Sequence, residues 1–398
     1  MKILQVNNVY GEKSTGKITQ VIHQGLLRAG HESVVVYGRG KDAHEEGVIR
    51  LCPEWYGKIN GLRARLTGIK YGGCALSTMR LFHIIRREKP DVVHLQCING
   101  NFVNIYSLIG WLKKHRIRTV VSLHAEFMHT ANCGHALDCT QWQHGCGKCP
   151  NVKRATRSLF FDRTGESWRR MKEAFAGFEE DAVICPVSPW TEIRAKQSDI
   201  MKDFRFRTVY NGIDTDHIFH LQGKKREKDN IVLNVTAYHS SEKEHLKGGW
   251  YLRELARRMP EVTFLVAGKA GQIPDLPENM KLLGVISDQQ ELAELYRNAR
   301  LSILVSKRET FSMPCAESLC CGTPVVGFRA GAPEMISLPE YSEFVQQGDL
   351  PGLEEVVRKW LSRTDLDAAE ISEAAKRTYS AETMVQNLLD VYGSLLWN

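Results

Sequence analysis

LSILVSKRETFSMPCAESLCCGTPVVGF, residues 301–328, has the pattern of a strand, a helix and a second strand in close succession. Residues 301–305 and 324–327 are short apolar runs typical of buried strands. The segment between them predicts a helix that begins near residue 313, and Gly322-Thr323-Pro324 is a turn signal before the second strand. A helix between two strands indicates a parallel pair joined by a right-handed crossover.

The same alternation of strands and helices extends over most of the chain. Strands are expected at 3–6, 33–37, 92–95, 119–123 and 183–187, and in a second series at 208–210, 231–235, 263–266, 301–305 and 324–327. Helical patterns lie between them, for example at 19–29, 103–115, 249–258 and 288–299. Two such series predict an α/β protein with two facing Rossmann-like domains. Because ligands bind beyond the carboxyl ends of such strands, we expect the site in the cleft between the domains.

Length and composition agree with two soluble domains. The chain has 398 residues, which is too long for a single hydrophobic core. Its composition, 43% hydrophobic and 25% charged, is that of an ordinary soluble protein. We expect an N-terminal domain at 1–200, a C-terminal domain at 201–379, and a C-terminal helix at 380–398 that crosses back to the N-terminal domain. No apolar run is long enough to span a membrane, and the first residues are too weakly apolar for a signal peptide, so we expect a cytosolic protein.

The positive charge is unevenly distributed. The formal net charge is +7, and the excess of Lys and Arg lies in the first half. Between Tyr56 and Lys89, basic residues far outnumber the one acid, and Leu62, Leu66 and Ile69 fall among them at helical spacing. This pattern predicts a basic amphipathic surface helix suited to anionic lipid headgroups, with an ordinary solvated helix face as the alternative. No nucleic-acid motif accompanies the charge, so we expect no nucleic-acid partner.

Two glutamates dominate the segment ETFSMPCAESLCCGTPVVGFRAGAPEMI, residues 309–336. Glu309 ends a strand, and Glu317 follows after seven residues at the start of a helix. This resembles the E-x7-E motif of the retaining glycosyltransferases of family 4, which have the GT-B fold. The resemblance implies that Glu309 holds the donor sugar, that Glu317 accepts hydrogen bonds from the ribose, and that the helix N-terminus faces the diphosphate. Two surface acids near a helix start are the ordinary alternative.

Two further segments resemble the same family. VYNGID, residues 209–214, is similar to the segment that joins its domains. LNVTAYHSSEKEHLKGG, residues 233–249, is similar to the stretch that ends in a diphosphate-binding Lys-Gly, here Lys247-Gly248. The family usually has an arginine five residues before that lysine. Glu242 stands there in this chain, so the second cation on the diphosphate is missing or is replaced by Lys243.

A histidine in the first half matches another family position. VVSLH ends an expected strand at His124, and the resemblance implies that this imidazole faces the donor sugar and the acceptor. It could donate a hydrogen bond to a sugar hydroxyl or to the leaving phosphate. Ala125 stands where relatives often have an aspartate, and we expect Glu126 and His129 to replace it in part. A structural histidine is the alternative.

GEKSTGKIT, residues 11–19, matches the P-loop pattern G-x4-G-K as far as its lysine. The next position of a P-loop is the Ser or Thr that binds Mg²⁺, and here it is Ile18, so we reject a nucleoside triphosphatase. Ser14-Thr15-Gly16-Lys17 resembles instead a tetrad in the first βα turn of transferases for exopolysaccharide or O-antigen. There Gly16 would allow close approach to the donor phosphate or the acceptor, and Lys17 would contact the donor.

Four of the 11 cysteines crowd into NCGHALDCTQWQHGCGKCP, residues 132–150, within an expected Cys-rich insert at 124–150. They are Cys133, Cys139, Cys146 and Cys149, and their spacing suits a tetrahedral thiolate site for a structural zinc ion. His135 and His144 are further possible ligands. Reduced cysteines without a metal, or a redox pair, are the alternatives.

These resemblances imply a retaining glycosyltransferase, a hexosyltransferase type of enzyme, that uses a UDP or GDP sugar. Its acceptor would be a glycan, isoprenoid-diphosphate-linked, in bacterial surface polysaccharide assembly. Catalysis would need no metal, because cations and the helix dipole take its place. The enzyme would lie peripherally on the inner face of the cell membrane. The implied catalytic residues are His124 and Glu309, and the implied donor-binding residues are Gly16, Lys17, Lys247, Thr310, Phe311, Ser312, Met313 and Glu317.

Other functions remain open at this point. A GT-B sugar-nucleotide epimerase or a soluble glycoside synthase would have the same donor site. A non-catalytic zinc-dependent binding protein would explain the cysteines and the basic first half without any donor.

Overall fold

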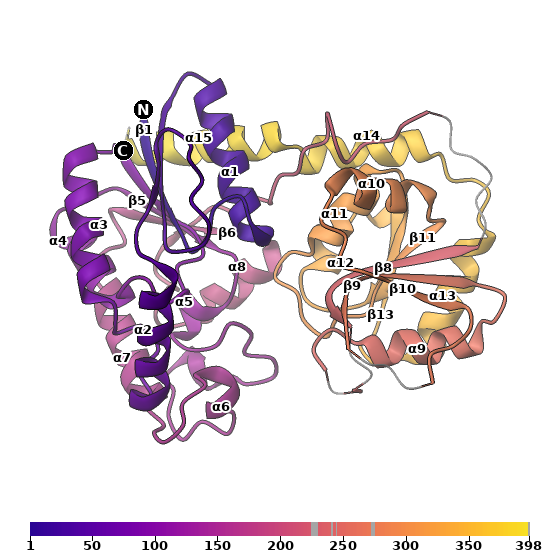
Figure 1. The fold of residues 1–398 in the computed structure, drawn as a ribbon, viewed down its shortest axis with the longest axis horizontal. Coiled ribbons are helices and arrows are strands. Elements are labelled where there is room, and N and C mark those ends of the chain that lie inside the picture. The colour runs from indigo at the N-terminus through magenta and orange to yellow at the C-terminus, as the bar shows by residue number, and fades with distance from the viewer. Residues whose placement is uncertain (224–229, 240–241, 244, 272–274, 397–398) are drawn as a thin grey trace. The chain divides into compact units, whose positions relative to one another are not determined.

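The computed structural model describes residues 1–223, 230–239, 242–243, 245–271 and 275–396 (Figure 1). The chain divides into two compact units, and each is treated by itself. The first unit is Met1–Tyr210 together with 384–398, and the second is Asn211–Thr383. The division falls later than the expected residue 200, because Arg207 and Val209 still donate backbone hydrogen bonds to Ile184 and Pro186 of the first unit.

The first unit contains a parallel sheet of seven strands in the order β3-β2-β1-β4-β5-β6-β7. The strands are β1 (Lys2–Asn7), β2 (Glu32–Tyr37), β3 (Val48–Arg50), β4 (Val92–Leu95), β5 (Thr119–Leu123), β6 (Ala182–Pro186) and β7 (Arg205–Phe206). The five strands predicted for this half are confirmed to within one residue at each end, whereas the short edge strands β3 and β7 were not predicted. The strand predicted at 208–210 is wrong, because that segment forms no regular ladder with β6.

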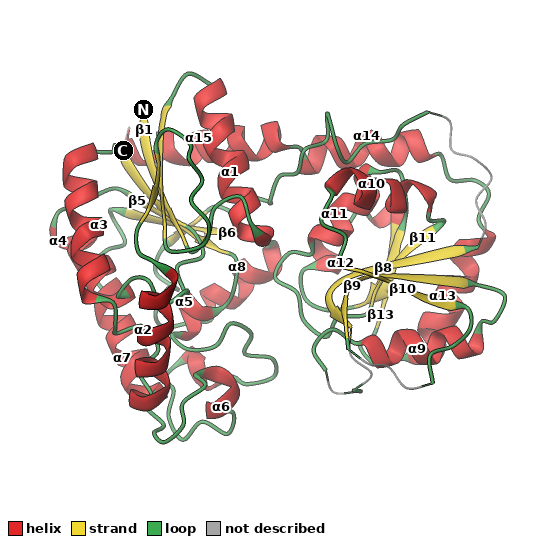
Figure 2. Cartoon of the chain, viewed as in Figure 1, coloured by secondary structure: helices red, strands yellow, loops and turns green. Residues whose placement is uncertain are grey.

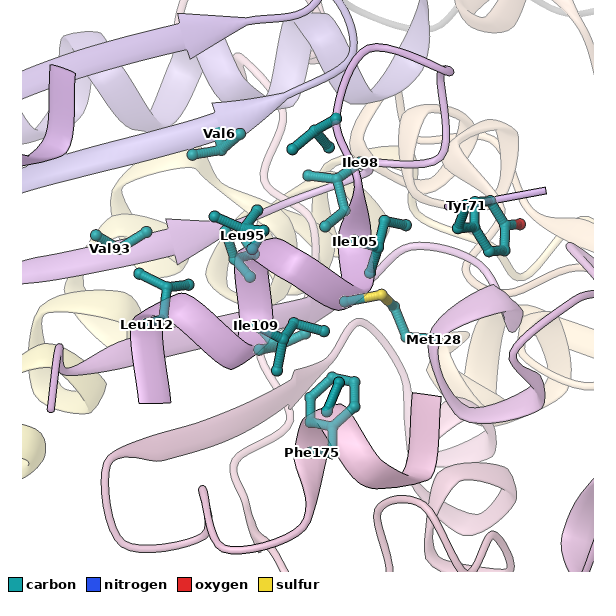
Figure 3. Packing of buried hydrophobic residues seen from close by; sticks show 14 of the residues in the cluster. Val6, Tyr71, Val93, Leu95, Ile98, Ile105, Ile109, Leu112, Met128 and Phe175 are labelled. Carbon is teal, nitrogen blue, oxygen red and sulfur yellow. The ribbon is translucent and has the colours of Figure 1, made fainter. Parts of the chain in front are cut away.

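Helices cover the sheet of the first unit (Figure 2). They are α1 (Lys13–Arg28), α2 (Glu54–Thr67), α3 (Ala75–Glu88), α4 (Ile105–Lys114), α5 (Phe127–Thr130), α6 (Val152–Ala155), α7 (Thr164–Phe175), α8 (Pro189–Lys196) and α15 (Ala381–Leu396), with a 3-10 turn at Gln141–Gln143. Figure 3 shows the core, where Leu95 of β4 meets Ile109 and Leu112 of α4, with Phe175 of α7 beyond them. All four side chains are fully buried.

The second unit has a parallel sheet of six strands in the order β10-β9-β8-β11-β12-β13. The strands are β8 (Ile231–His239), β9 (Thr263–Ala270), β10 (Met280–Gly284), β11 (Leu301–Leu304), β12 (Val325–Phe328) and β13 (Ser342–Val345). Its helices are α9 (Gly249–Arg258), α10 (Gln289–Asn298), α11 (Met313–Cys320), α12 (Pro333–Ile336), α13 (Leu350–Ser362) and α14 (Ala368–Tyr379), with a 3-10 turn at Pro339–Tyr341. The predicted strand–helix–strand at 301–328 is confirmed as β11, α11 and β12, and Ser302 pairs in parallel with Val325.

Both sheets have the doubly wound strand order, in which the chain builds outward from the centre in one direction and then in the other. The direction reverses between β1 and β4 in the first unit and between β8 and β11 in the second. At such a reversal the loops after the two central strands run to opposite faces and leave a crevice at their carboxyl ends, where ligands bind. Within the described residues, no helix combines the length and the apolarity needed to cross a bilayer.

The C-terminal helix α15 is held in the first unit by packing and by one buried hydrogen bond. A Cβ atom on Gly25 of α1 would lie 2.5 Å from Val385, so only glycine admits this helix. The Tyr392 hydroxyl lies 2.7 Å from Nδ1 of His94, and the other ring nitrogen of His94 lies 2.8 Å from Ser122 Oγ. Burial lowers the pKa of His94 to about 3, so its ring is neutral near pH 7.

Replacing Tyr392 with Phe should destabilise the first unit by about 1–2 kcal/mol, because it leaves a buried ring nitrogen of His94 with only a 3.4 Å contact to Gln96. Thermal unfolding of the Tyr392→Phe variant should show a lower Tm than wild type. Gln386→Ala is the control on the same helix, since Gln386 is exposed and its hydrogen bond to Asp390 lies at the surface. Equal Tm values for the Phe variant and wild type would contradict a stabilising role for the His94–Tyr392 bond.

Candidate active site

The predicted donor residues Lys247 and Glu309 are in contact at the strand reversal of the second unit. Lys247 lies in the loop between β8 and α9, and Glu309 lies in the loop after β11. The Lys247 ammonium is 2.7 Å from Glu309 Oε1, and the two side chains are 24% and 22% exposed. The structure therefore brings together a cation and a carboxylate that lie far apart in the sequence, at the place where ligands bind in doubly wound sheets.

Gly248 makes this contact possible. It has a φ of 68°, and a Cβ atom there would lie 1.8 Å from the carbonyl oxygen of Val305. Only glycine can therefore bring the loop of Lys247 against the end of β11. A backbone hydrogen bond of 2.8 Å from Lys307 to Leu246 fastens the two loops. The Lys-Gly pair thus combines a cation with the backbone that positions it.

The backbone of Glu309 is held by the loop after β12. Its N–H donates to the Ala330 carbonyl at 2.9 Å, and its own carbonyl accepts from Ala332. That loop is fixed in turn by Glu334, whose carboxylate accepts from the N–H groups of Ala330 and Gly331, each at 3.0 Å. Glu334 therefore positions Glu309 through the backbone.

The residues between Glu309 and α11 differ in what they can offer a ligand. Ser312 precedes the helix with a φ of 86°, an uncommon conformation for a non-glycine residue, and it turns the chain sharply into α11. Thr310 and Met313 are partly exposed. The ring of Phe311 is 3% exposed and meets Tyr379 edge to face at 6.4 Å. Phe311 therefore presents its backbone, not its ring, at this site.

Glu317 lies in α11 and is almost completely buried. Its Oε2 accepts a hydrogen bond of 3.0 Å from the hydroxyl of Tyr296 on α10. Burial and the neighbouring carboxylate raise the pKa of Tyr296 well above its usual value, so the hydroxyl remains a donor. Tyr296 orients Glu317, and no sequence pattern had singled it out.

The cation expected before Lys247 is absent. Glu242 is exposed, and Lys243 lies over the ring of Trp250, 4.9 Å from its centroid. Lys243 is therefore directed at an aromatic side chain. Residues 240, 241 and 244 of the same inserted segment lie outside the part of the chain that the structure describes.

In the first unit, His124 follows β5 and lies in a row of buried polar side chains. Its Nε2 is 2.6 Å from Gln96 Oε1, and the amide nitrogen of Gln96 donates to Gln5 Oε1 at 3.1 Å. Because an amide oxygen only accepts, Nε2 of His124 carries the proton. Burial lowers the pKa of His124 to about 4, so the imidazole is neutral near pH 7.

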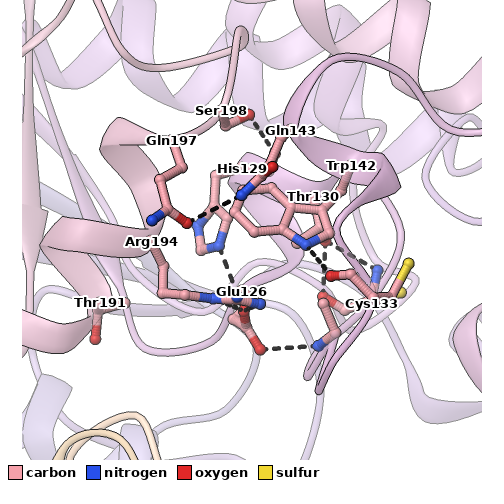
Figure 4. A network of polar contacts seen from close by, with 12 residues as sticks. Glu126, His129, Thr130, Cys133, Trp142, Gln143, Thr191, Arg194, Gln197 and Ser198 are labelled. Atoms are coloured by element: carbon pink, nitrogen blue, oxygen red, sulfur yellow. Dashed lines mark hydrogen bonds and ion pairs between the residues drawn. The ribbon is translucent and has the colours of Figure 1, made fainter.

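The expectation that Glu126 and His129 replace a missing acid beside His124 is wrong, because both are fully buried in a structural ion-pair network (Figure 4). Glu126 Oε1 accepts from Arg194 Nε and Nη2 at 2.9 and 2.7 Å, and Oε2 accepts from the Ala136 N–H at 2.8 Å. Burial alone would raise the pKa of Glu126, but His129 and Arg194 lower it to about 2. The network ties the Cys-rich segment to α8.

The first βα turn differs in structure from the expected glycine loop. Helix α1 begins at Lys13, so Ser14 to Lys17 lie in its first turns and not in a loop. A Cβ atom on Gly16 would lie 3.1 Å from Val9 Cγ2 and 3.3 Å from its carbonyl, so the space beside this glycine is filled by the chain itself. Ile18, where a P-loop has its Mg²⁺ ligand, is buried in the core. Lys17 is partly exposed.

The four clustered cysteines are reduced and partly buried. Burial, with the neighbouring thiols adding to it, raises the pKa of Cys133 to about 11 and that of Cys146 to about 12. Cys139 and Cys149 contribute electrostatically to both pKa shifts, so the four thiols lie near one another. In the described ranges, however, no group of three or more His, Cys, Asp or Glu side chains is arranged to hold a metal ion. The zinc site stays a prediction.

Comparisons with known proteins agree with the two units. The family profile described as Glycosyltransferase Family 4 matches residues 17–217, half of the chain, and the one described as Glycosyl transferases group 1 matches residues 232–363. The "Putative colanic acid biosynthesis glycosyl transferase WcaC" of Escherichia coli K12 is 23% identical over 419 aligned positions, which cover 99% of this chain and 100% of that protein.

Two solved structures have the same fold along their whole length. Sucrose-phosphate synthase from Thermosynechococcus elongatus superposes with a TM-score of 0.67 at 15% identity, covering 99% of this chain and 98% of that one. Anabaena Alr3699/HepE in complex with UDP superposes with a TM-score of 0.65 at 15% identity, covering 99% and 100%. At such low identity these likenesses establish the GT-B fold alone. The family profile over half the chain shows more: this protein belongs to glycosyltransferase family 4.

Proposed function

We propose that the protein transfers a sugar from a UDP or GDP sugar, with retention of the anomeric configuration, to a lipid-linked glycan in bacterial surface polysaccharide assembly. The observation that carries the proposal is the Lys247–Glu309 pair at the strand reversal of the second unit. UDP bound to the Anabaena neighbour and the colanic acid relative support the donor class and the pathway type.

The contacts of the second unit suggest how a donor would bind. A diphosphate would compete with Glu309 for the Lys247 ammonium and release that carboxylate toward the sugar. The backbone N–H groups at the start of α11 would add donors to the same phosphates. Glu317, oriented by Tyr296, would accept from the ribose hydroxyls. Lys247 and the N–H groups at the start of α11 would supply the positive charge that the leaving diphosphate needs.

His124 of the first unit suits a sugar better than a phosphate. Because its imidazole is neutral, it can form hydrogen bonds to a hydroxyl but offers no fixed charge to an anion. For transfer with retention, the acceptor hydroxyl attacks from the side that the nucleotide leaves. The departing phosphate oxygen can then take the acceptor proton, so the mechanism requires no strongly basic side chain.

The outer face of α2 supports a membrane location. Trp55, Ile59, Leu62 and Leu66 are 61%, 59%, 53% and 42% exposed, and their spacing places them on one face, away from the buried Gly57 and Ala64. Basic residues flank this apolar face, which is typical of helices that lie in a membrane interface. The sequence had placed Ile69 on the same face, but α2 ends at Thr67 and Ile69 is 8% exposed.

The donor site predicts nucleotide-dependent stabilisation. A nucleoside diphosphate at about 100 times its Kd should stabilise wild type by about 2.7 kcal/mol, because it binds only the folded state. A thermal-shift panel of UDP, GDP, ADP and CMP should show a rise for UDP or GDP that is lost in Lys247→Ala and reduced in Glu317→Gln. The Gln variant keeps an acceptor for Tyr296, and Glu294→Ala on the exposed side of α10 is the control. A wild type that no nucleotide stabilises would refute this donor site.

The four cysteines predict a bound metal. Protein purified without chelator should contain about one zinc ion per chain by elemental analysis. Cys146→Ser and Cys149→Ser should lose the metal, whereas Cys97→Ser, a partly buried cysteine outside the cluster, should keep it. If wild-type protein contains no zinc, the prediction is wrong and the four cysteines are reduced thiols without a metal.

The α2 face predicts membrane binding through apolar contacts. Ile59→Ser combined with Leu62→Ser should weaken flotation with anionic vesicles at least about tenfold, since two apolar side chains no longer leave water. Val285→Ser, an exposed apolar residue of the second unit, is the control. If the α2 variant floats as wild type does, an acceptor in solution becomes the better proposal.

A further inference from the structure

A small basic pocket lies beside the apolar face of α2 in the first unit. Its volume is about 160 Å³, and its wall includes Arg63 of α2, Arg163 just before α7 and Arg170 within α7. Asn60 and Thr67 of α2 add polar atoms. Ligand pockets for drug-sized molecules are about 300–1,000 Å³, so this one has room for a headgroup and not for a whole nucleotide.

Two glycines keep the pocket open. A Cβ atom on Gly72 would lie 2.8 Å from Ile69 and 3.6 Å from Arg170 Nη1, and one on Gly73 would lie 2.9 Å from Asn60 Oδ1. Any other residue at these positions would narrow the space between the loop after α2 and the arginines. The backbone of 72–73 therefore forms a wall of the pocket that lies close to the guanidinium group of Arg170.

The charge of the pocket is positive even when Glu166, an acid outside its wall that pairs with two of its arginines, is counted. Glu166 lies 2.5 Å from Arg170 Nη2 and 3.9 Å from Arg163 Nε, so it partly neutralises these two. Among the residues that the structure describes, no ion pair holds Arg63. Three guanidinium groups and one carboxylate leave a net positive charge on a concave surface. A guanidinium group can donate two parallel hydrogen bonds to two oxygens of one phosphate.

Exposed apolar side chains lie next to this pocket. Leu159, Phe160 and Phe161 are 48%, 72% and 52% exposed. Their loop is fastened to the end of α2 by a hydrogen bond of 2.9 Å from the Leu159 N–H to the Arg65 carbonyl. The guanidinium of Arg163 lies 5.5 Å from the ring of Phe161. Apolar groups thus stand next to a phosphate-sized basic pocket, and Figure 1 shows α2 and α7 together in this part of the first unit.

We propose that the pocket formed by Arg63, Arg163 and Arg170 binds the phosphate group of a membrane lipid, while α2 and residues 159–161 enter its apolar region. The proposal rests on the membrane docking proposed above and names the group recognised there. A phosphate ester of this kind could belong to an anionic phospholipid or to an isoprenoid phosphate that carries the acceptor glycan.

Matched pairs of arginine variants test the pocket. Arg63→Gln with Arg170→Gln removes two charges from the pocket, and Arg65→Gln with Arg169→Gln removes two exposed charges from the same two helices outside it. Flotation is measured on phosphatidylcholine vesicles that contain phosphatidic acid, a polyprenyl phosphate, or cholesteryl hemisuccinate at equal charge density. The hemisuccinate arm carries carboxylates instead of phosphates. Nucleotide-induced thermal shift in each variant tests the fold and the donor site independently.

The expected result is a loss of binding to phosphate-containing vesicles that is at least about tenfold larger for the pocket pair than for the outside pair. On hemisuccinate vesicles the two pairs should behave alike. Equal losses by both pairs on every vesicle, or no loss by the pocket pair, would overturn the proposal in favour of diffuse surface attraction. A pocket effect on polyprenyl phosphate alone would identify the acceptor lipid, and one on both phosphates would identify a general headgroup site.

Discussion

The close approach of Gly248 to the carbonyl of Val305 is the constraint on which the proposed donor site depends. It allows the loop after β8 to rest against the end of β11, although the two loops run to opposite faces of the sheet. Lys247 and Glu309 can then form an ion pair across the strand reversal. Glu334 completes the arrangement: its carboxylate accepts a hydrogen bond from the N–H of Ala330, whose carbonyl accepts one from the N–H of Glu309. Three neighbouring strands thus fix one cation and one carboxylate with few degrees of freedom.

The first unit uses buried polar contacts for a similar purpose. His124 is joined through Gln96 to Gln5, so the ends of β5, β4 and β1 are connected by side-chain hydrogen bonds. His94 of β4, two residues before Gln96, forms a hydrogen bond with Tyr392 and so joins the sheet to the C-terminal helix. Both histidines are neutral because they are buried, and each is oriented by a hydrogen bond. The histidine proposed to contact a sugar and the histidine that holds the fold are therefore oriented by the same physical means.

Charge and apolar surface are separated along the chain in a way that fits two kinds of phosphate. The second unit presents Lys247 in a loop against Glu309, which precedes α11, whereas the first unit presents several arginines among exposed aromatic and aliphatic side chains. A soluble nucleotide needs only the former. The exposed apolar side chains of the first unit are unfavourable in water unless a partner covers them. This is the physical argument for a lipid at α2 and residues 159–161.

The sequence by itself determined most of the strands and the two Rossmann-like units, because apolar runs encode them, and a family resemblance singled out Lys247, Glu309 and Glu317. The tertiary structure decided the partners of Glu317 and His124: Tyr296 and Gln96 come from distant elements that no local pattern joins. It also showed that Glu334, in the same segment as Glu309, holds the loop that fixes the Glu309 backbone. It also reversed one expectation, because Glu126 is buried in an ion pair with Arg194 and does not stand beside His124 as a substitute acid. The ring of Phe311 packs on Tyr379, which no local pattern indicated. Local periodicity reports which face of an element is buried, but only the packed fold decides what each polar side chain meets there.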